Sequence, residues 1–321
     1  MKAMVRQRLA SLLPAFLGVA VVTFVVIRVL PGDVAMLVLG GDIGTIDPEI
    51  LVATRERLGI AGSIPSQFFR WISGIVTLDF GESFYTREPV IGSIARTLPY
   101  TAEIALLATL IAVGISIPLG TLAAVRQNSW LDHIVRAGTL VGMALPSFWL
   151  GIMMLLLMVR WFNWTPPLTD YGLFSNPWVN LQLVILPALA VSLRLTAVNT
   201  RLTRSSMLDV LHEEYVVAAR SRGIRRSSVI GIHALRNAVV PVFTLSTLEF
   251  GYLFGGLIVT ENVFQVPGLG SLLVQSVTRR DFPIIQTTIL AITIIIMIVN
   301  LLTDLGNALL DPRIRSGVSR S

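Results

Sequence analysis

YTAEIALLATLIAVGISIPLGTLAAV, residues 100–125, carries a single charged side chain, Glu103, in an otherwise mostly apolar run. An α-helix needs about 20 apolar residues to cross the hydrocarbon core of a bilayer, so this stretch predicts a transmembrane helix. Five other stretches meet the same requirement, at residues 9–30, 134–159, 181–203, 241–263 and 283–305. The sequence therefore predicts an all-α integral membrane protein with six transmembrane helices.

The composition agrees with a membrane protein and excludes several kinds of site. Hydrophobic residues make up 54% of the chain and charged residues 14%, and the mean hydropathy is +0.75. Because there is no cysteine, the chain has no disulfide, no thiolate nucleophile and no zinc site of the cysteine type. The only lysine is Lys2, so a P-loop is excluded, and none of the three histidines accompanies a Gly-x-Ser-x-Gly serine. We expect a chain that is not an enzyme and binds neither metal nor nucleotide.

Charge is distributed unevenly among the hydrophilic segments. Residues 194–240 carry eight arginines against three carboxylates, whereas residues 31–97 carry five arginines against eight carboxylates. Since arginine-rich loops are retained in the cytoplasm, we expect N-in/C-in topology. The expected segments are residues 1–30, the cytoplasmic N-terminus and first span; 31–97, an extracytoplasmic loop; 98–310, a five-helix core with a cytoplasmic loop at 204–240; and 311–321, a cytoplasmic tail.

The insert EEYVVAARSRGIRRSSVIGIHALRN, residues 213–237, predicts a helix, a turn and a second helix. Apolar residues recur at steps of three and four, which is the spacing of one helix face. Gly223 is suited to end this helix, and Ser227 or Ser228 to cap a second helix through Asn237. The residues of the expected face are Leu208, Leu211, Tyr215 and Ala218.

Three roles fit this outline. The insert could lie on anionic membrane lipid, or it could dock a soluble partner. A DNA-reading helix-turn-helix has a similar outline, but membrane spans tether the insert at both ends and keep it from a duplex, so we expect no nucleic acid.

The insert also resembles a known motif. With the residues that follow, EEYVVAARSRGIRRSSVIGIHALRNAVVPV is similar to the EAA loop of ABC-importer permeases. Ala218, Ala219 and Gly223 match the Ala-Ala-x-x-x-Gly core, and HALRNA resembles the variant of the dipeptide, oligopeptide and nickel permease family. The resemblance implies that the first short helix is a coupling helix that seats in a groove of an ATPase subunit. The residues expected to couple are Glu214, Tyr215, Ala218, Ala219, Arg220, Gly223, His233, Arg236 and Asn237.

Further motifs extend the resemblance over essentially the whole chain. FVVIRVLPGDVAMLVLG, at 24–40, resembles the family's first span and its PGDPA exit, with Val34 in place of proline. LDFGESF, at 78–84, resembles GDLGxS, with Leu78 in place of glycine. The other similar segments are PSFWLG at 146–151, ENVFQVPGLGSLL at 261–273, RRDFPIIQ at 279–286 and LTDLGNALLDPRIR at 302–315.

This resemblance implies the type I importer permease fold and a set of partners. The partners are a second, homologous permease, two ABC ATPases that use ATP and Mg²⁺, and an extracytoplasmic substrate-binding protein. Short peptides are the expected cargo, and nickel, another metal chelate or a small sugar is the alternative. A stand-alone secondary transporter is a more distant alternative, because it would need an ion site within the membrane.

Glu249 is an ionisable residue inside an expected span, and such residues are functional candidates. We expect it to face the translocation path or the partner permease, the alternative being an ion pair with a neighbouring span. Gly251 and Gly255 form a small-xxx-small pair, more typical of helix packing than of ligand binding. Pro146, in the third-span motif, completes the candidates for the pathway or the subunit interface.

The extracytoplasmic segment is long enough to hold structure of its own. IPSQFFRWISGIVTLDFGESF, residues 64–84, includes an aromatic-rich amphipathic stretch too short to span a bilayer. In the family this region lies under the binding protein. We expect Asp79, Gly81 and Ser83 to contribute to the outer gate and docking surface.

Overall fold

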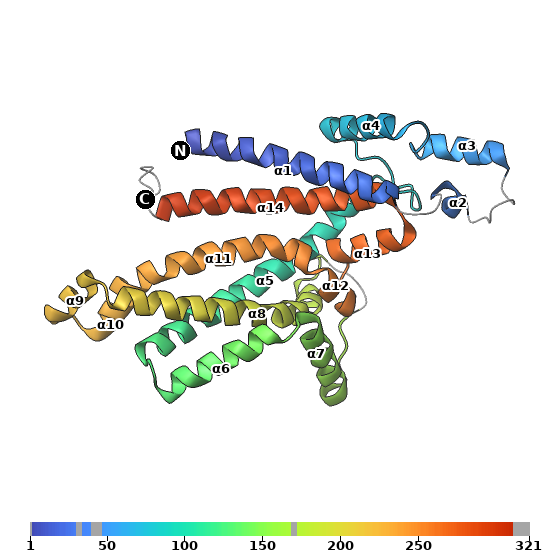
Figure 1. The fold of residues 1–321 in the computed structure, drawn as a ribbon. Helices are drawn as coiled ribbons and strands as arrows, with labels where there is room; N and C mark the ends of the chain where they lie inside the picture. The colour runs from blue at the N-terminus through green and yellow to red at the C-terminus, as the bar shows by residue number, and fades with distance from the viewer. Residues whose placement is uncertain (1, 30–33, 40–46, 168–171, 311–321) are drawn as a thin grey trace. The chain divides into compact units, whose positions relative to one another are not determined.

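The computed structural model describes residues 2–29, 34–39, 47–167 and 172–310. In these ranges the regular structure is helical, apart from an isolated antiparallel bridge between Glu82 and Pro89. The expected tail, residues 311–321, lies outside them. In chain order the helices are α1 (Lys2–Val29), α2 (Val34–Leu39), α3 (Pro48–Arg57), α4 (Ile64–Thr77), α5 (Val90–Val125), α6 (Trp130–Ala144), α7 (Ser147–Phe162), α8 (Pro177–Leu211), α9 (Glu214–Ser221), α10 (Arg226–Ser228), the π-helix η1 (Val229–Ala234), α11 (Leu235–Gly256), α12 (Ile258–Phe264), α13 (Leu269–Arg279) and α14 (Phe282–Leu310) (Figure 1).

The described helices confirm an all-α membrane protein. Five helical segments are long and apolar enough to cross a bilayer, and a sixth span results if α6 and α7 are counted together. The five are Ala10–Arg28, Val90–Val125, Pro177–Leu211, Arg226–Gly256 and Phe282–Asn307.

The third expected span, residues 134–159, is not one continuous helix. α6 ends at Ala144, α7 begins at Ser147, and the two helices are bent by 98°. Leu145 is extended, with ψ 127°, because a residue before proline is disfavoured in the helical region. Pro146 follows it at the N-cap of α7. The apolar run hides this bend, since hydrophobic residues continue on both sides of it.

The fifth expected span, residues 241–263, is also divided. α11 ends at Gly256, and α12 begins at Ile258. At its other end α11 is preceded by η1, so the second insert helix does not stop at Asn237 but continues into α11.

The insert's first expected helix is interrupted as well. α8 extends to Leu211, and α9 starts at Glu214 after an extended residue, Glu213, with ψ 142°. Leu208 therefore lies on α8 and Ala218 on α9, and the predicted single face is wrong. The second helix starts at Arg226, ahead of the expected serine caps.

The chain forms two compact units, each of which is packed internally. Of the described residues, the larger comprises 100–167, 172–267 and 295–310. Here α8 packs against α6, α7 and α11, and Figure 1 shows it between α6 and α11. Small residues allow the close approach: a Cβ on Gly142 would lie 3.1 Å from Ala197, and one on Gly120 would lie 2.6 Å from Thr203.

The smaller unit comprises, of the described residues, 2–29, 34–39, 47–99 and 268–294. Phe24 of α1 is buried and packs against Phe68 and Trp71 of α4, with ring centroids 5.1 and 5.6 Å away. Arg28 Nε donates a hydrogen bond to Gln67 Oε1 at 3.1 Å. The amphipathic stretch expected after residue 64 is therefore a helix, and its aromatic face is held by α1.

Candidate functional site

Helix α9 has one buried face and one exposed face. Val216 and Ala219 are buried in an apolar cluster with Leu211, Val229 and Ala238. The exposed residues of α9 are Glu214, Tyr215, Val217, Ala218, Arg220 and Ser221. The two alanines of the motif therefore differ, since Ala219 packs α9 against its own chain whereas Ala218 faces outward.

Gly223 follows α9 where the sequence predicts a helix stop. Its φ is +74°, a left-handed conformation that glycine adopts without a steric penalty. The Gly223 N–H donates to Arg220 O at 3.0 Å, and the Ile224 N–H donates to Ala219 O at 3.3 Å, as in a Schellman motif. Apart from its chain neighbours, none of the described residues has an atom within 4 Å of the position of an added Cβ, so the backbone, and not packing, requires glycine here.

Three of the expected coupling residues meet at a polar contact. Asn237 Nδ2 donates to the Tyr215 hydroxyl at 2.7 Å, and that hydroxyl donates to the His233 carbonyl at 3.4 Å. These bonds join α9 to η1 and α11. Arg236 and Arg220 are exposed and remain accessible to a partner.

Glu249 lies beside an arginine of the neighbouring helix. Arg194 Nη1 of α8 is 3.7 Å from Glu249 Oε2 of α11, and the exposed fractions of the two side chains are 53% and 22%. This is an open pair, and both side chains are partly exposed on this chain. The same helices are also joined by a buried bond in which Asn199 Nδ2 donates to Ser246 Oγ at 3.0 Å.

The other pathway candidates, Gly251, Gly255 and Pro146, lie at different places in the structure. A Cβ on Gly251 would lie 3.1 Å from Val299, so Gly251 packs against α14 of its own chain. Gly255 is half-buried on the same helix, α11. Pro146 occupies the bend between α6 and α7.

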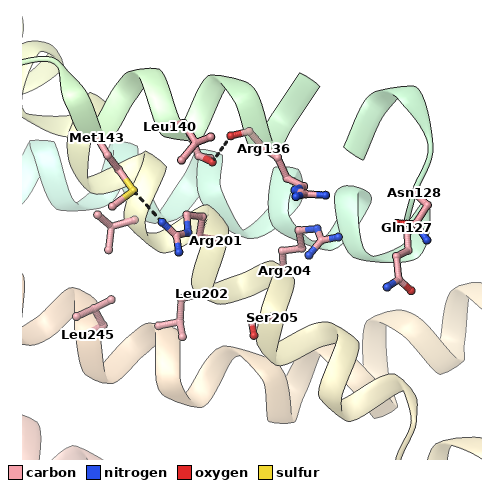
Figure 2. Close-up of a pocket in the computed structure, with 12 residues that line it drawn as sticks. Gln127, Asn128, Arg136, Leu140, Met143, Arg201, Leu202, Arg204, Ser205 and Leu245 are labelled. Atoms are coloured by element: carbon pink, nitrogen blue, oxygen red, sulfur yellow. Dashed lines mark hydrogen bonds between the residues drawn. The ribbon is translucent and has the colours of Figure 1, made fainter. Parts of the chain in front are cut away.

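A cavity of about 900 Å³ lies between α6, α8 and α11. Figure 2 shows Arg136 on α6 and Arg201 and Arg204 on α8 around it. Leu245 lines it from α11. A single cavity thus collects three guanidinium groups from two helices.

Arg204 is held in a closed ion pair. Its Nε donates to Asp132 Oδ1 at 2.6 Å and its Nη2 to Asp132 Oδ2 at 2.7 Å. Asp132 is fully buried, and only 19% of the Arg204 side chain is exposed. Asp132 Oδ2 also accepts the Asn128 N–H at 3.0 Å, so both carboxylate oxygens are occupied.

Arg136 and Arg201 differ from Arg204. Both are exposed, and in the described part of the chain no ion pair joins either to a carboxylate. Arg201 Nη1 lies 3.6 Å from Met143 Sδ (Figure 2), a weak acceptor. Two guanidinium groups in the cavity therefore keep donors for another group.

The expected outer-gate residues lie in the loop after α4. Asp79 and Gly81 are exposed, and the Gly81 N–H donates to Asp79 Oδ1 at 3.1 Å. Leu78, which replaces the motif's glycine, caps α4 with φ +59°. This left-handed backbone explains why glycine suits the position.

Ser83 does not reach the surface. Only 2% of the residue is exposed, and its hydroxyl donates to Asp281 Oδ2 at 2.5 Å. The Phe84 N–H donates to the other oxygen of Asp281 at 3.3 Å. Ser83 therefore anchors the loop, whereas Asp79 and Gly81 are presented to solvent.

Sequence reasoning missed Asp132, included Asp281 only as part of the RRDFPIIQ motif, and counted Arg136, Arg194, Arg201 and Arg204 only as loop charges. Asp132 had a signal, because it lies three residues after Ser129, whose hydroxyl accepts the Asp132 N–H at 3.4 Å as an N-cap. The partners of these residues lie far away in sequence and could not be assigned. Within the described residues, no group of His, Asp and Glu side chains is arranged to hold a metal.

Comparison with known proteins agrees with this architecture. A family model described as binding-protein-dependent transport system inner membrane component matches residues 116–316. The corresponding model of the N-terminal part matches residues 1–105. The chain belongs to this family.

Relatives of this permease subunit match it over almost their full length. A Brucella abortus (strain 2308) protein, assigned by name to a peptide transport system as a permease, is 37% identical over 315 residues, covering 98% of this chain and 99% of the relative. The di/tripeptide transport system permease protein DppB of Pseudomonas aeruginosa (strain UCBPP-PA14) is 34% identical over 335 residues, with coverage of 98% and 99%. The dipeptide transport system permease protein DppB of Escherichia coli (strain K12) is 36% identical over 332 residues, with coverage of 96% and 97%.

These findings establish the class of the protein. It is a permease subunit of an ABC transport system in the bacterial inner membrane, and such subunits are not themselves enzymes. The expected family and its membrane location are thus confirmed.

Proposed function

We propose that this subunit forms half of the translocation pathway of an ATP-driven importer of short peptides. The observation that carries the proposal is the near-complete match to relatives named for peptide, di/tripeptide and dipeptide transport. The complete transporter would contain a second homologous permease, two ABC ATPases and an extracytoplasmic binding protein. ATP and Mg²⁺ would be used by the ATPases, and this chain would contact membrane lipid on its outer surface.

In this proposal α9 is the coupling helix, with both termini of the chain in the cytoplasm. Its outward face, including Glu214 and Ala218, would seat in an ATPase groove. Its buried face and the Gly223 cap would make it move with α8. ATP-driven closure of the ATPases would shift this unit and alternate access between the two sides. Exposed Arg220 and Arg236 can pair with carboxylates of the ATPase.

The pathway would run along the polar side of α8 and α11. Arg194, Glu249 and Arg201 retain solvent exposure, and exposing such charges to lipid is costly. A water-filled path shared with the second permease removes that cost. The outer end would be built by the loop that carries Asp79 and Gly81, with Ser83 as its internal anchor.

The coupling assignment is tested by Ala218→Glu, which adds a charge to the outward face without entering the apolar cluster. Its matched control is Ser73→Glu, at an exposed position on α4. Tagged chains are solubilised in mild detergent, and the co-purified subunits are quantified. We expect recovery of two ATPases and a second permease with the wild type and the control, and about tenfold less ATPase with Ala218→Glu. Equal ATPase recovery from both variants would remove α9 as the docking element.

The cargo is tested in proteoliposomes that contain the complete transporter and its binding protein. Uptake of a radiolabelled dipeptide that requires ATP would support the peptide assignment. Uptake of nickel or a small sugar in place of peptide would change the assigned cargo, and the protein would still be a subunit of an ATP-driven importer. Solute movement by this chain alone, without ATP, would indicate a secondary transporter.

A further inference from the structure

We propose that the cavity between α6, α8 and α11 is a transit site for short peptides, in which Arg136 and Arg201 bind the C-terminal carboxylate. The N-terminal ammonium group of the same peptide reaches Glu249. This inference rests on the proposed function, because it names how the substrate of that function is held.

The charges of the cavity identify its ligand as an oxyanion. The charge of Arg204 is compensated by the bidentate pair with Asp132, so Arg204 adds little positive charge to the cavity. Arg136 and Arg201 reach the cavity from different helices, and among the described residues neither forms a close ion pair with a carboxylate; Arg136 acts on the buried Asp132 only through its charge. Guanidinium groups bind carboxylates through two parallel hydrogen bonds. The cavity therefore offers two guanidinium groups that no carboxylate hydrogen-bonds in the described part of the chain, next to a third, Arg204, whose charge is compensated.

Size and spacing favour a short peptide as the source of the oxyanion. A volume of about 900 Å³ lies within the usual range of small-molecule sites. Arg194 and Arg201 lie two turns apart on α8, a rise of about 10 Å along its axis. An extended tripeptide spans about 10 Å. A peptide bound at Arg201 can therefore reach the level of Arg194 and its partner Glu249.

The pair at that level is suited to exchange partners. Arg194 and Glu249 are 3.7 Å apart, and more than half of the Arg194 side chain is exposed. An ammonium group can replace Arg194 at Glu249 without breaking a closed bidentate contact. A zwitterionic peptide thereby finds a positive site and a negative site at a separation that matches its length, whereas a lipid phosphate would use only the positive site.

The absence of cysteine from the chain allows a direct test. Val198 lines the cavity, and Val198→Cys places one thiol there; Ser73→Cys on α4 is the exposed control. The complete transporter, without binding protein, is placed in phosphatidylcholine nanodiscs. Each variant is labelled with an anionic (2-sulfonatoethyl) or a cationic (2-trimethylammonioethyl) methanethiosulfonate, and the modification of this chain is followed by mass spectrometry.

We expect the ratio of anionic to cationic labelling rates to be about tenfold higher at Val198→Cys than at Ser73→Cys. Arg136→Gln with Arg201→Gln should remove this preference, whereas Arg126→Gln, at an exposed arginine outside the cavity, should retain it. Equal ratios at the two thiols would overturn the proposal.

Protection then identifies the ligand. Trialanine should slow the labelling of Val198→Cys. Trialanine with a C-terminal amide should protect the thiol little, because it lacks the carboxylate. N-acetyl-trialanine should protect the thiol less than trialanine does, because it lacks the ammonium group that Glu249 binds. Equal protection by trialanine and the amide would overturn the carboxylate assignment. Protection by added phosphatidylglycerol, with none by trialanine, would assign the site to lipid. Co-purification of ATPases is measured in a separate experiment. Loss of the ATPases would count against the proposed function, whereas absent protection by peptide would count against the transit site alone.

Discussion

Helix α8 carries two ion pairs that differ in nearly every physical respect. Arg204 meets a fully buried carboxylate, Asp132, through two hydrogen bonds of 2.6 and 2.7 Å. Arg194 meets Glu249 at 3.7 Å, and both side chains are partly exposed. A closed pair cannot release a partner cheaply, because an uncompensated buried charge is costly. An open, solvated pair contributes little to stability and can exchange partners. The Arg204–Asp132 pair therefore fits a structural role, and the Arg194–Glu249 pair fits a functional one.

The largest expected effect comes from breaking the closed pair. Asp132→Asn removes the charge that compensates Arg204, and we expect the free energy of unfolding to fall by about 3 kcal/mol. Thermal unfolding of the purified subunit in mild detergent, followed by size-exclusion chromatography, measures the change. The double variant Asp132→Leu with Arg204→Leu should recover most of the stability, since it leaves no unpaired charge. A single variant as stable as the wild type would remove the distinction between the pairs.

A smaller effect is expected when the charge is kept and the geometry changed. Arg204→Lys retains a cation but loses the planar fork that satisfies both oxygens of Asp132. We expect a loss of about 2 kcal/mol in the same unfolding assay. If Arg204→Lys kept full stability, charge alone, and not bidentate geometry, would account for the stabilising effect of this ion pair.

The open pair should respond in activity more than in stability. Glu249→Gln should change the free energy of unfolding by less than about 1 kcal/mol, because the pair is open and faces water in the proposed path. Dipeptide import into proteoliposomes should fall about tenfold, through loss of a charged hydrogen-bond partner. Import that is unchanged in rate and selectivity would exclude Glu249 from the pathway.

The smallest effect is expected for Arg194→Lys. A compact cation can serve a loose contact as well as a guanidinium group can, so stability should change by less than about 0.5 kcal/mol. Import should stay close to the wild-type rate in the same proteoliposomes. A loss as large as that of Arg204→Lys would show that the two pairs are equivalent after all.

Local features of the fold could be predicted from the sequence. Residues 100–125 and the other apolar runs predict membrane helices because length and hydropathy are local properties. Gly223 was identifiable as a helix stop, and its left-handed backbone agrees with that prediction. The amphipathic stretch after residue 64 was identifiable for the same reason, since a helix face follows from spacing alone.

Features that depend on distant partners could not be predicted. Asp132 and Arg204 are separated by 72 positions, and Ser83 and Asp281 by 198. Although Asp132 follows its N-cap Ser129 locally, neither pairing can be assigned from a local stretch of sequence. Tyr215 was assigned to a face with Leu208 because periodicity continued across residue 213, where the backbone breaks. The bend at Pro146 was missed because the apolar composition of α6 and α7 outweighed the effect of one proline.

The bend at Pro146 also bears on how the chain is made. α6 and α7 contain 15 and 16 residues, and neither alone reaches the roughly 20 residues that secure a helix across the bilayer. Both pack against α8, which is synthesised after them. During translation α6 and α7 leave the ribosome before α8, against which they pack. Their stable insertion therefore depends on a helix that has not yet been synthesised.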